Sequence, residues 1–427
     1  MPAPNSTIDI VMFNMSSYTD WQHGIANRNM HILHTLLADS RVRKIVAIDY
    51  LPFTYKRAVR QWFQNVLSGP AGQVLGRGWG YKLTALNNYE IEKTGYVMPG
   101  AGGPDEIKHK LLVYSSVQSA WSETAFYRRL NQELKRLNLK NIVLWSYLPT
   151  FVGYFGSVGE QVAVFDAVDN WLEHSSYIKV KERIKVNYQT IRTKADLIFT
   201  TAADLAKLFN LPEGCIFVPN GVDFERINQA PRLTGRDIAQ LPRPIIGYIG
   251  TIQEDRVDVE LIRYLAEANP QKSFVLIGGV WPGLRKKIKE RLQSLPNLHF
   301  LGRKSFRETP QYLREFDVAI IPHLQNEFNR QIPHLQNEFN RHTNPMKLYE
   351  YLAAGKPVVA TPGAGLDEFK DLVYLAAKPE DFNQALIQAL QENGNELKER
   401  RMVAAAHESW TERVNVMLDK IFAKLDS

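Results

Sequence analysis

The strongest constraint on the fold is a regular alternation of apolar runs and amphipathic segments between Pro244 and Pro322. The runs PIIGYIG, SFVLIGG, LHFLGR and DVAIIP have the length and composition of buried strands, and helices are expected at 257–268, 284–295 and 309–316. Strands that alternate with helices in this way form a parallel sheet covered on both faces. This half of the chain therefore predicts a doubly wound α/β domain.

The first half of the chain predicts a second domain of the same class. A helix is expected from Asp20 to Leu37, with Thr19 and Gln22 at the spacing of a capping box. Buried strands are expected at 8–13, 45–52, 141–147 and 195–201, and a further strand begins at Val162. Because 427 residues suffice for two cores, we predict an N-terminal domain at 1–222, a linker at 223–243, a second domain at 244–408 and a C-terminal helix at 409–427.

The stretch NPMKLYEYLAAGKPVVAT, residues 344–361, predicts a short helix that leads directly into a buried strand. Asn344 is a good N-cap and Pro345 suits the first helical position. Lys347 then lies in the first turn, where the helix dipole already favours an anion such as a diphosphate. Glu350 shares that face and suits hydrogen bonds from ribose hydroxyls. The simpler alternative is an exposed Lys347–Glu350 ion pair on an ordinary capped helix.

This pattern resembles the donor-binding segment of GT-B glycosyltransferases, and in particular group 1 (family 4-like) enzymes that build bacterial surface polysaccharides. The resemblance implies two Rossmann-like doubly wound domains facing a cleft, with a C-terminal helix that crosses back to the first domain. It also implies that the second domain binds the diphosphate and ribose of a nucleotide-sugar. The donor-binding residues are then expected to be Gly250, Thr251, Arg256, Gly278, Arg303, His342, Asn344, Met346, Lys347 and Glu350.

The sequence departs from the family pattern at two of these positions. Many members carry an Arg and a Lys just after the glycine that corresponds to Gly250, whereas this chain has TIQEDRV and offers only Arg256. The commonest motif also has a glutamate where this chain has His342. Lys347 is therefore expected to supply most of the positive charge, and the donor sugar and the anomeric outcome stay open.

The acceptor is expected to meet the first domain. His23, Gly24 and Arg28 follow the first strand, at the edge where open α/β sheets bind ligands. Asp169 and Asp166 close a later strand, VAVFDAVDN, where a carboxylate can act as general base toward a hydroxyl. The alternative is that the first three are capping or surface residues and that Asp169 caps the segment after it.

Charge and hydropathy suggest an anionic surface as a further partner. Residues 1–222 hold 24 Lys and Arg against 18 Asp and Glu, whereas 223–427 hold 28 against 27. The segment KRAVRQWFQNVL, 56–67, has the composition of an interfacial membrane helix, although a core-packed helix with a basic edge fits equally well. The sequence shows no apolar run of membrane-spanning length and no secretory leader, which predicts a cytoplasmic protein, peripheral on the inner face of the plasma membrane.

Other chemistries are disfavoured. The glycine-rich PGAGGP at 99–104 does not lie between a strand and a helix, as a dehydrogenase fingerprint would. The single cysteine, Cys215, excludes a multi-cysteine metal site, no metal-binding Asp-x-Asp is present, and no nucleic-acid-binding motif accompanies the basic charge. We expect neither a metal nor a cofactor beyond the nucleotide-sugar substrate, which is UDP- or GDP-linked.

The predicted function is a metal-independent hexosyltransferase that moves a sugar from a nucleotide-diphosphate donor to a hydroxyl of a lipid-linked or cell-surface glycan. The alternatives are a GT-B epimerase acting on the nucleotide-sugar itself, and an inactive nucleotide-sugar-binding partner protein. An identical tandem repeat, IPHLQNEFNR at 321–330 and 332–341, precedes the donor segment and is too short for a solenoid. One copy is surplus in a loop, where added length costs little closure entropy.

Overall fold

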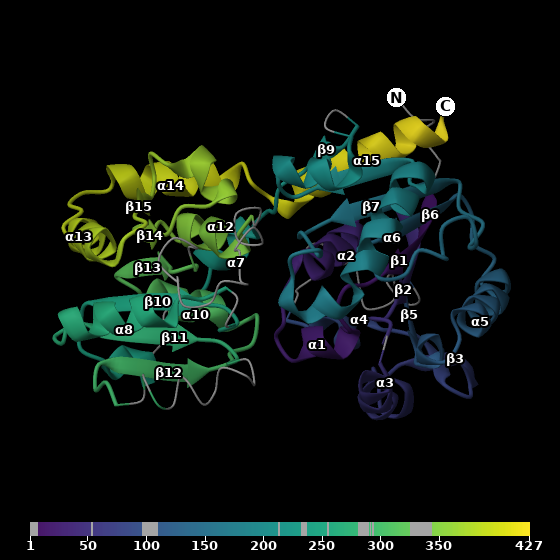
Figure 1. Cartoon of the computed structure of the whole chain (residues 1–427), viewed down its shortest axis with the longest axis horizontal. Coiled ribbons are helices and arrows are strands. Elements are labelled where there is room, and N and C mark those ends of the chain that lie inside the picture. The colour runs from purple at the N-terminus through teal and green to yellow at the C-terminus, as the bar shows by residue number, and fades with distance from the viewer. Residues whose placement is uncertain are drawn as a thin grey trace. The chain divides into compact units, whose positions relative to one another are not determined.

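The computed structural model of the chain divides into two compact units, drawn in Figure 1. Unit 1 comprises residues 1–172, 179–218 and 414–427, and unit 2 comprises residues 173–178 and 219–413. The structure describes residues 7–52, 54–95, 110–211, 214–231, 237–253, 256–280, 290, 292, 294–324 and 344–427. The glycine-rich segment at 99–104, His342 and nearly all of the tandem repeat lie outside these ranges.

Unit 1 is built on a nine-stranded sheet with the order β3-β4-β5-β2-β1-β6-β7-β8-β9. Neighbouring strands are parallel, except that β4 is antiparallel to both β3 and β5. The strands are β1 (Ile8–Phe13), β2 (Val42–Ile48), β3 (Gln73–Gly78), β4 (Tyr81–Ala85), β5 (Leu111–Ser116), β6 (Ile142–Ser146), β7 (Val162–Ala167), β8 (Leu197–Thr200) and β9 (Ile216–Phe217). Strands β1 and β7 are buried along their whole length, as their continuous apolar runs predict.

The helical elements of unit 1 connect these strands. They are α1 (Tyr18–Gln22), α2 (Arg28–Ala38), α3 (Tyr55–Gln61), the π-helical turn η1 (Trp62–Leu67), α4 (Asn88–Glu92), η2 (Gln118–Ala120), α5 (Glu123–Arg136), α6 (Lys181–Lys194) and η4 (Ala203–Phe209). A further turn, η3 (Ser175–Val180), includes residues of both units.

The prediction of one helix from Asp20 to Leu37 is wrong, because the segment forms α1 and α2 with a loop between them. The capping box uses Ser17 and Asp20 rather than Thr19 and Gln22. Gly24 adopts a left-handed φ of 82°, which ends the first helix. Asn27 then caps α2 by accepting a hydrogen bond from the Met30 amide.

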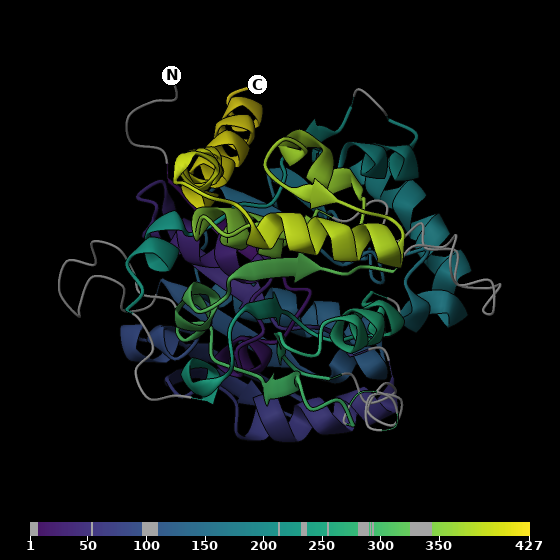
Figure 2. The same ribbon diagram turned by 90° about the vertical axis from the view of Figure 1, so that its left-hand side faces the viewer.

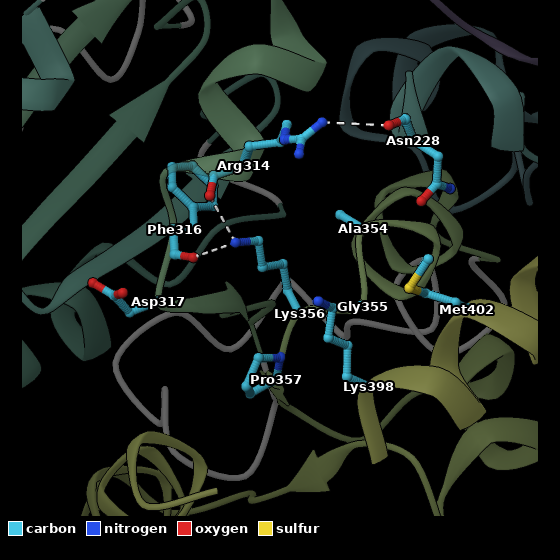
Figure 3. A pocket seen from close by; sticks show the side chains of 10 residues that line it. All are labelled: Asn228, Arg314, Phe316, Asp317, Ala354, Gly355, Lys356, Pro357, Lys398 and Met402. Carbon is cyan, nitrogen blue, oxygen red and sulfur yellow. Dashed lines mark hydrogen bonds between the residues drawn. The ribbon is translucent and has the colours of Figure 1, made fainter. Parts of the chain in front are cut away.

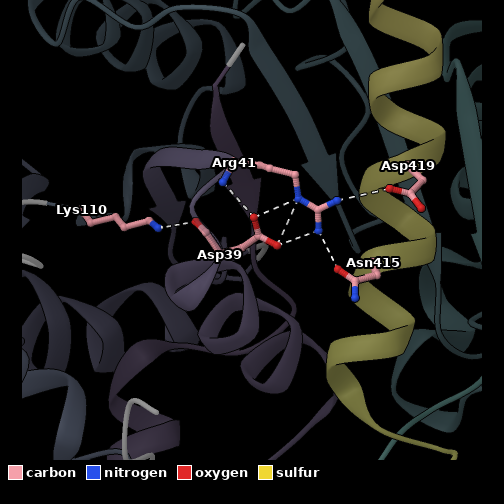
Figure 4. A network of polar contacts seen from close by, with 5 residues as sticks. All are labelled: Asp39, Arg41, Lys110, Asn415 and Asp419. Atoms are coloured by element: carbon pink, nitrogen blue, oxygen red, sulfur yellow. Dashed lines mark hydrogen bonds and ion pairs between the residues drawn. The ribbon is translucent and has the colours of Figure 1, made fainter. Parts of the chain in front are cut away.

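The C-terminal helix α15 (Trp410–Leu425) passes from unit 2 into unit 1 near Val414. Arg41 attaches its second half to the rest of unit 1, as Figure 4 shows. The Arg41 Nη2 donates to Asn415 Oδ1 at 2.6 Å, and its Nη1 lies 3.2 Å from Asp419 Oδ1. Asp39 forms an ion pair with the same guanidinium. Arg41 thus connects the loop before β2 to the second half of α15, within unit 1.

In its described residues, unit 2 confirms the predicted alternation of strands and helices. Most of the helix predicted at 284–295 lies outside the described residues. Its six-stranded sheet is parallel throughout and has the order β12-β11-β10-β13-β14-β15. The strands are β10 (Ile245–Ile249), β11 (Ser273–Ile277), β12 (Leu298–Gly302), β13 (Val318–Ile321), β14 (Val358–Ala360) and β15 (Tyr374–Leu375).

Helices cover both faces of this sheet, seen from two directions in Figures 1 and 2. One core packs α10 and α12 on residues such as Ala319 and Val358, and the other packs α8 and α13 on residues such as Ile320 and Val359. The alternation of neighbouring strand residues between the two cores follows from the pleat. The elements are α7 (Phe224–Asn228), η5 (Asp237–Gln240), α8 (Val259–Ala268), α10 (Thr309–Arg314), α12 (Met346–Ala353), η7 (Ala364–Phe369), α13 (Pro379–Leu390) and α14 (Glu396–Ala406).

The predicted linker, 223–243, contains α7 and η5 rather than irregular chain alone. Its residues Ile227 and Ile238 are buried in the core of unit 2.

Across the described ranges, no helix combines the length and the hydropathy that crossing a bilayer requires.

Candidate functional site

Two glycines shape the carboxyl edge of the sheet in unit 2. Gly250 ends β10 and Gly278 ends β11, and both have φ of 152°, which side chains rarely allow. A Cβ atom on Gly278 would lie 1.9 Å from the Gly250 carbonyl oxygen, and one on Gly250 would lie 2.9 Å from the Tyr248 hydroxyl. The two strand ends therefore approach each other closely because Gly278 lacks a side chain, and the absence of one at Gly250 leaves room for the Tyr248 hydroxyl and the Lys347 side chain.

Helix α12 begins at this edge, but it is not capped as predicted. The helix starts at Met346, with Pro345 in the cap position, and no side chain caps it. Asn344 instead accepts a hydrogen bond from the Asn220 amide at 3.2 Å and donates through Nδ2 to the Tyr349 hydroxyl at 2.9 Å. The prediction that Asn344 is the N-cap is wrong, and Asn344 joins two segments of unit 2 instead.

Lys347 lies in the first turn of α12 and is partly buried. Its Nζ is 3.4 Å from His323 Nε2 and 5.1 Å from the centre of the Tyr248 ring. Burial, and next the charge of Arg256, lower the pKa of Lys347 to about 7, although Glu350 opposes the shift. The surroundings of Lys347 therefore disfavour the charged form of its amine.

His323 is a site residue that the sequence did not indicate. It follows β13 at the carboxyl edge of the sheet and is buried. Thr361 fixes its backbone, since the Thr361 hydroxyl donates to the His323 carbonyl at 2.9 Å and accepts from its amide at 3.0 Å. Burial, Lys347 and Arg256 hold the pKa of His323 well below its usual value, so the ring is neutral at physiological pH.

Lys347, Arg256 and His323 form what we call the basic cluster. The structure brings together Lys347, Gly250 and Arg256 as predicted, and it adds His323. Basic groups that gather at a helix N-terminus, where they lower the pKa of Lys347 and of His323, provide a setting that an anion would stabilise. Among the described residues no carboxylate forms an ion pair with Lys347, and Glu350 pairs with Arg226, so the alternative of an exposed Lys347–Glu350 pair is not met.

Glu350 has a different partner. Its Oε1 accepts from Arg226 Nη2 at 3.0 Å. Arg226, in α7, also donates to the Phe306 carbonyl at 2.8 Å and lies 3.6 Å from the centre of the Phe306 ring. Sequence reasoning missed Arg226, because it lies 124 residues before Glu350 and no local spacing connects them.

The other predicted donor-site residues lie around the same edge. The Thr251 carbonyl accepts from the Tyr248 hydroxyl at 3.2 Å. Arg303 follows β12, and a Cβ on Gly279 would lie 2.8 Å from Arg303 Nη2, so this guanidinium lies against the backbone after β11. Met346 is the first residue of α12 and is half-buried. His342 lies outside the described residues.

In unit 1 the structure joins two predicted site residues as an ion pair. Arg28, the first residue of α2, donates through Nε to Asp166 in β7 at 2.9 Å. Arg28 is 3% and Asp166 0% exposed. Burial raises the pKa of Asp166, although Arg28 opposes the shift. Asp166 is therefore engaged inside the fold rather than open to solvent.

The remaining residues of this edge are more accessible. Asp169 comes three residues after Asp166 and is half-buried. The Asn170 side chain accepts from the Leu172 amide at 3.2 Å, and no α-helix starts directly after it. His23 is exposed and ends α1, with its ring Nδ1 2.6 Å from the Thr19 carbonyl. Gly24 provides the turn that follows.

A cavity of about 490 Å³ lies at the other edge of the sheet in unit 2, shown in Figure 3. It is lined in part by Asp317 and Lys356, which precede β13 and β14 and so mark the amino ends of these strands. The Lys356 ammonium already donates to the carbonyls of Arg314 and Phe316, each at 2.7 Å. Since ligands of open α/β sheets bind at the carboxyl ends, this cavity is not the predicted site.

Known proteins resemble the chain in both sequence and structure. Residues 243–392 match the family described as Glycosyl transferases group 1. TuaH of Bacillus subtilis (strain 168), named as a glycosyltransferase of teichuronic acid biosynthesis, is 31% identical over 199 residues. These residues are 45% of this chain and 47% of TuaH, so the match spans about half the length of that relative.

Two solved structures share the fold across nearly the whole chain. HepE of Anabaena, in complex with UDP and glucose, has a TM-score of 0.62 at 14% identity and covers 97% of this chain and 99% of its own. A UDP-forming trehalose-phosphate synthase of Burkholderia xenovorans has a TM-score of 0.63 at 12% identity, with the same coverage. The predicted fold class is confirmed. The protein therefore has the GT-B fold of these glycosyltransferases, and its residues 243–392 match the glycosyl transferases group 1 family.

Proposed function

We propose that the protein is a glycosyltransferase that moves a hexose from a nucleotide-diphosphate-sugar to a hydroxyl of a lipid-linked or cell-surface glycan. The observation that carries the proposal is the basic cluster at the start of α12, where Lys347, Arg256 and His323 meet beside the glycine turn at Gly250. The likeness to TuaH supports the glycan acceptor, and the UDP bound to HepE supports a uridine or related nucleotide donor.

In the proposed reaction, the basic cluster stabilises the diphosphate as it leaves the sugar. Lys347 and the first amides of α12 supply positive charge where negative charge develops, and the surrounding fold holds them in place before the donor arrives. We propose that these groups do this work without a bound metal ion and without a further cofactor. Glu350, held by Arg226, is placed one turn along the same helix and is proposed to accept from the ribose hydroxyls.

The two aspartates of unit 1 receive different roles in this proposal. Asp169 is half-buried and is the proposed general base if the reaction inverts the anomeric centre. Asp166 is fully buried and bound to Arg28, which supports a positioning role for both residues. A retaining reaction would need no protein base at this point. His23 and Gly24, at the same edge of unit 1, are proposed to contact the acceptor.

The test is sugar transfer and donor hydrolysis by the purified protein, with a panel of UDP- and GDP-linked sugars. Lys347→Ala is expected to lower the turnover at least about 100-fold, as the removal of one preorganised donor group does elsewhere. The matched control is Lys398→Ala, which removes an exposed lysine of the same unit. Unchanged turnover in Lys347→Ala would remove the central assignment.

The same assay separates the two alternatives. Conversion of the nucleotide-sugar without any acceptor would identify an epimerase. Calorimetric binding of a nucleotide-sugar with no turnover on any acceptor would identify an inactive binding protein.

We further propose that the protein works in the cytoplasm, peripherally attached to the inner face of the plasma membrane. A lipid-linked acceptor would be presented there, and unit 1 contains the basic segment that the sequence singled out.

A further inference from the structure

An exposed apolar surface lies at one end of unit 1. Tyr55, Val59, Phe63 and Leu67 recur every four residues along α3 and η1, with exposed fractions of 63%, 57%, 63% and 43%. Trp79, after β3, is 67% exposed, and Trp121, after η2, is 46% exposed. We call these six residues the aromatic patch.

Ring contacts hold the patch together. Trp121 lies between two partners, with its ring centre 5.2 Å from that of Trp79 and 6.0 Å from that of Tyr55. Trp79 also contacts the half-buried Trp62, at 6.3 Å. Three segments far apart in the sequence therefore present one continuous apolar surface.

The inner side of the same helical segment packs into the fold. Ala58 and Val66 are buried in a small core with Val117, and Trp62 packs against that core. Val59 and Phe63 lie on the same helical segment but are 57% and 63% exposed, unlike Val66 and the packed Trp62. Because Val59 and Phe63 face solvent, the interpretation of this segment as a core-packed helix does not account for these two residues.

The charge around the patch has one sign. Between Tyr50 and Tyr89 the sequence holds five Lys and Arg and no Asp or Glu. Three of these cations, Lys56, Arg60 and Arg77, are exposed. Glu123 is the first acidic residue after Trp121, and Arg183 already binds it.

We propose that the aromatic patch and these cations form the surface by which the protein lies on an anionic phospholipid bilayer. The inference deepens the proposed function, on which it rests for the lipid-linked acceptor, by assigning the residues that contact the lipid. Trp, Tyr and Phe partition into the headgroup region, and each nearby Lys or Arg gains attraction from anionic headgroups. A second copy of the chain is a poorer occupant, because a two-fold contact would bring the same cations face to face.

The experiment is co-sedimentation of the full-length protein with vesicles of phosphatidylcholine alone or mixed with phosphatidylglycerol, without donor or acceptor. The protein is expected to bind the mixed vesicles, and less of it should sediment with them as the salt rises from about 0.1 M to about 1 M. Phe63→Ser with Trp79→Ser should weaken binding at least about tenfold, because two apolar side chains no longer enter the bilayer. The matched control is Val186→Ser, which removes an exposed apolar residue of α6 that is 66% exposed.

Charge is tested separately with Lys56→Gln and Arg60→Gln, which should reduce binding to the mixed vesicles and flatten its salt dependence. Circular dichroism and the elution volume establish that each variant is folded and monomeric. The inference is overturned if the wild-type protein ignores the mixed vesicles, if the patch variant binds as well as Val186→Ser, or if the wild-type protein is a dimer that the patch variant dissociates. A wild-type protein that turns over the donor but does not bind the mixed vesicles would refute this surface alone, whereas a wild-type protein that binds the vesicles but shows no turnover would refute the proposed function alone.

Discussion

The charged side chains at the carboxyl edges of the two sheets are arranged differently in unit 1 and unit 2. In unit 1 the buried charges of Arg28 and Asp166 neutralise each other at 2.9 Å. In unit 2 Lys347 lies beside Arg256 and a neutral His323, and the carboxylate on its own helix is bound to Arg226. The basic and acidic groups are paired at the edge in unit 1, whereas basic groups gather at the edge in unit 2.

The difference indicates which edge awaits an anion. A paired buried charge is held by its partner, so removal of the partner damages the fold. When basic groups gather in one site without an acidic partner, removing one of them costs little folding stability. The removal instead lowers the affinity for the anionic ligand. The comparison therefore separates residues that hold the fold from residues that hold the donor.

The largest expected effect on stability is that of Arg28→Ala, which leaves Asp166 buried without its cation. The free energy of unfolding should fall by about 3–5 kcal/mol, measured by urea denaturation of the transition that reports on unit 1. The double variant Arg28→Met with Asp166→Leu should recover most of this loss. Arg263→Ala, which breaks an exposed pair with Glu267, is the control and should cost about 0.5 kcal/mol or less. A loss below about 1 kcal/mol for Arg28→Ala would contradict the assignment.

A smaller effect concerns the pH dependence of donor affinity. Lys347 has a pKa of about 7 in the empty site, and a bound diphosphate raises this pKa because it stabilises the ammonium form. Below about pH 7 both states hold the proton, so the affinity is constant. Above it the affinity should fall by up to about tenfold per pH unit, because binding must then take up a proton.

This dependence is measured by calorimetry with a nucleotide-sugar from about pH 6 to about pH 9. Lys347→Met should bind weakly and show a flat profile. A flat profile for the wild-type protein over this range would mean that Lys347 does not touch the diphosphate.

The smallest effect is expected for the stability of Lys347→Met. Removing the ammonium relieves its proximity to Arg256, so the free energy of unfolding of unit 2 should stay constant or rise by up to about 1 kcal/mol at pH 6. The adjacent control, Leu348→Ala, removes a fully buried side chain and should cost about 2–5 kcal/mol. A comparable loss in Lys347→Met would place Lys347 among the residues that hold the fold.

Local sequence patterns predicted the elements of unit 2 well. Apolar runs bounded by Gly and Pro gave β10, β11 and β13 nearly to the residue, because a strand buried on both faces leaves an unmistakable pattern. Gly250 was placed at the sheet edge for the same reason, because it directly follows β10, whereas Lys347 was placed by the predicted start of a helix. The predicted domain limits and the roles of the site residues stay predictions.

The features that sequence reasoning missed depend mostly on contacts distant in sequence. Arg28 and Asp166 are 138 residues apart, and their pairing exists only once α2 lies beside β7. Asn344 has the chemistry of an N-cap, but Asn220 and Tyr349 engage its side chain. His323 lies in the first copy of the tandem repeat, which indicated no chemistry for it. Its position after β13 was the one available signal, because side chains after parallel strands meet at the same edge.

The most direct test is a crystal structure of the protein with a bound nucleotide-sugar. We expect the diphosphate at the first turn of α12, with a phosphate oxygen within hydrogen-bonding distance of the Lys347 Nζ and beside Arg256. A nucleotide bound elsewhere, or a Lys347 side chain directed into solvent away from the phosphates, would contradict it.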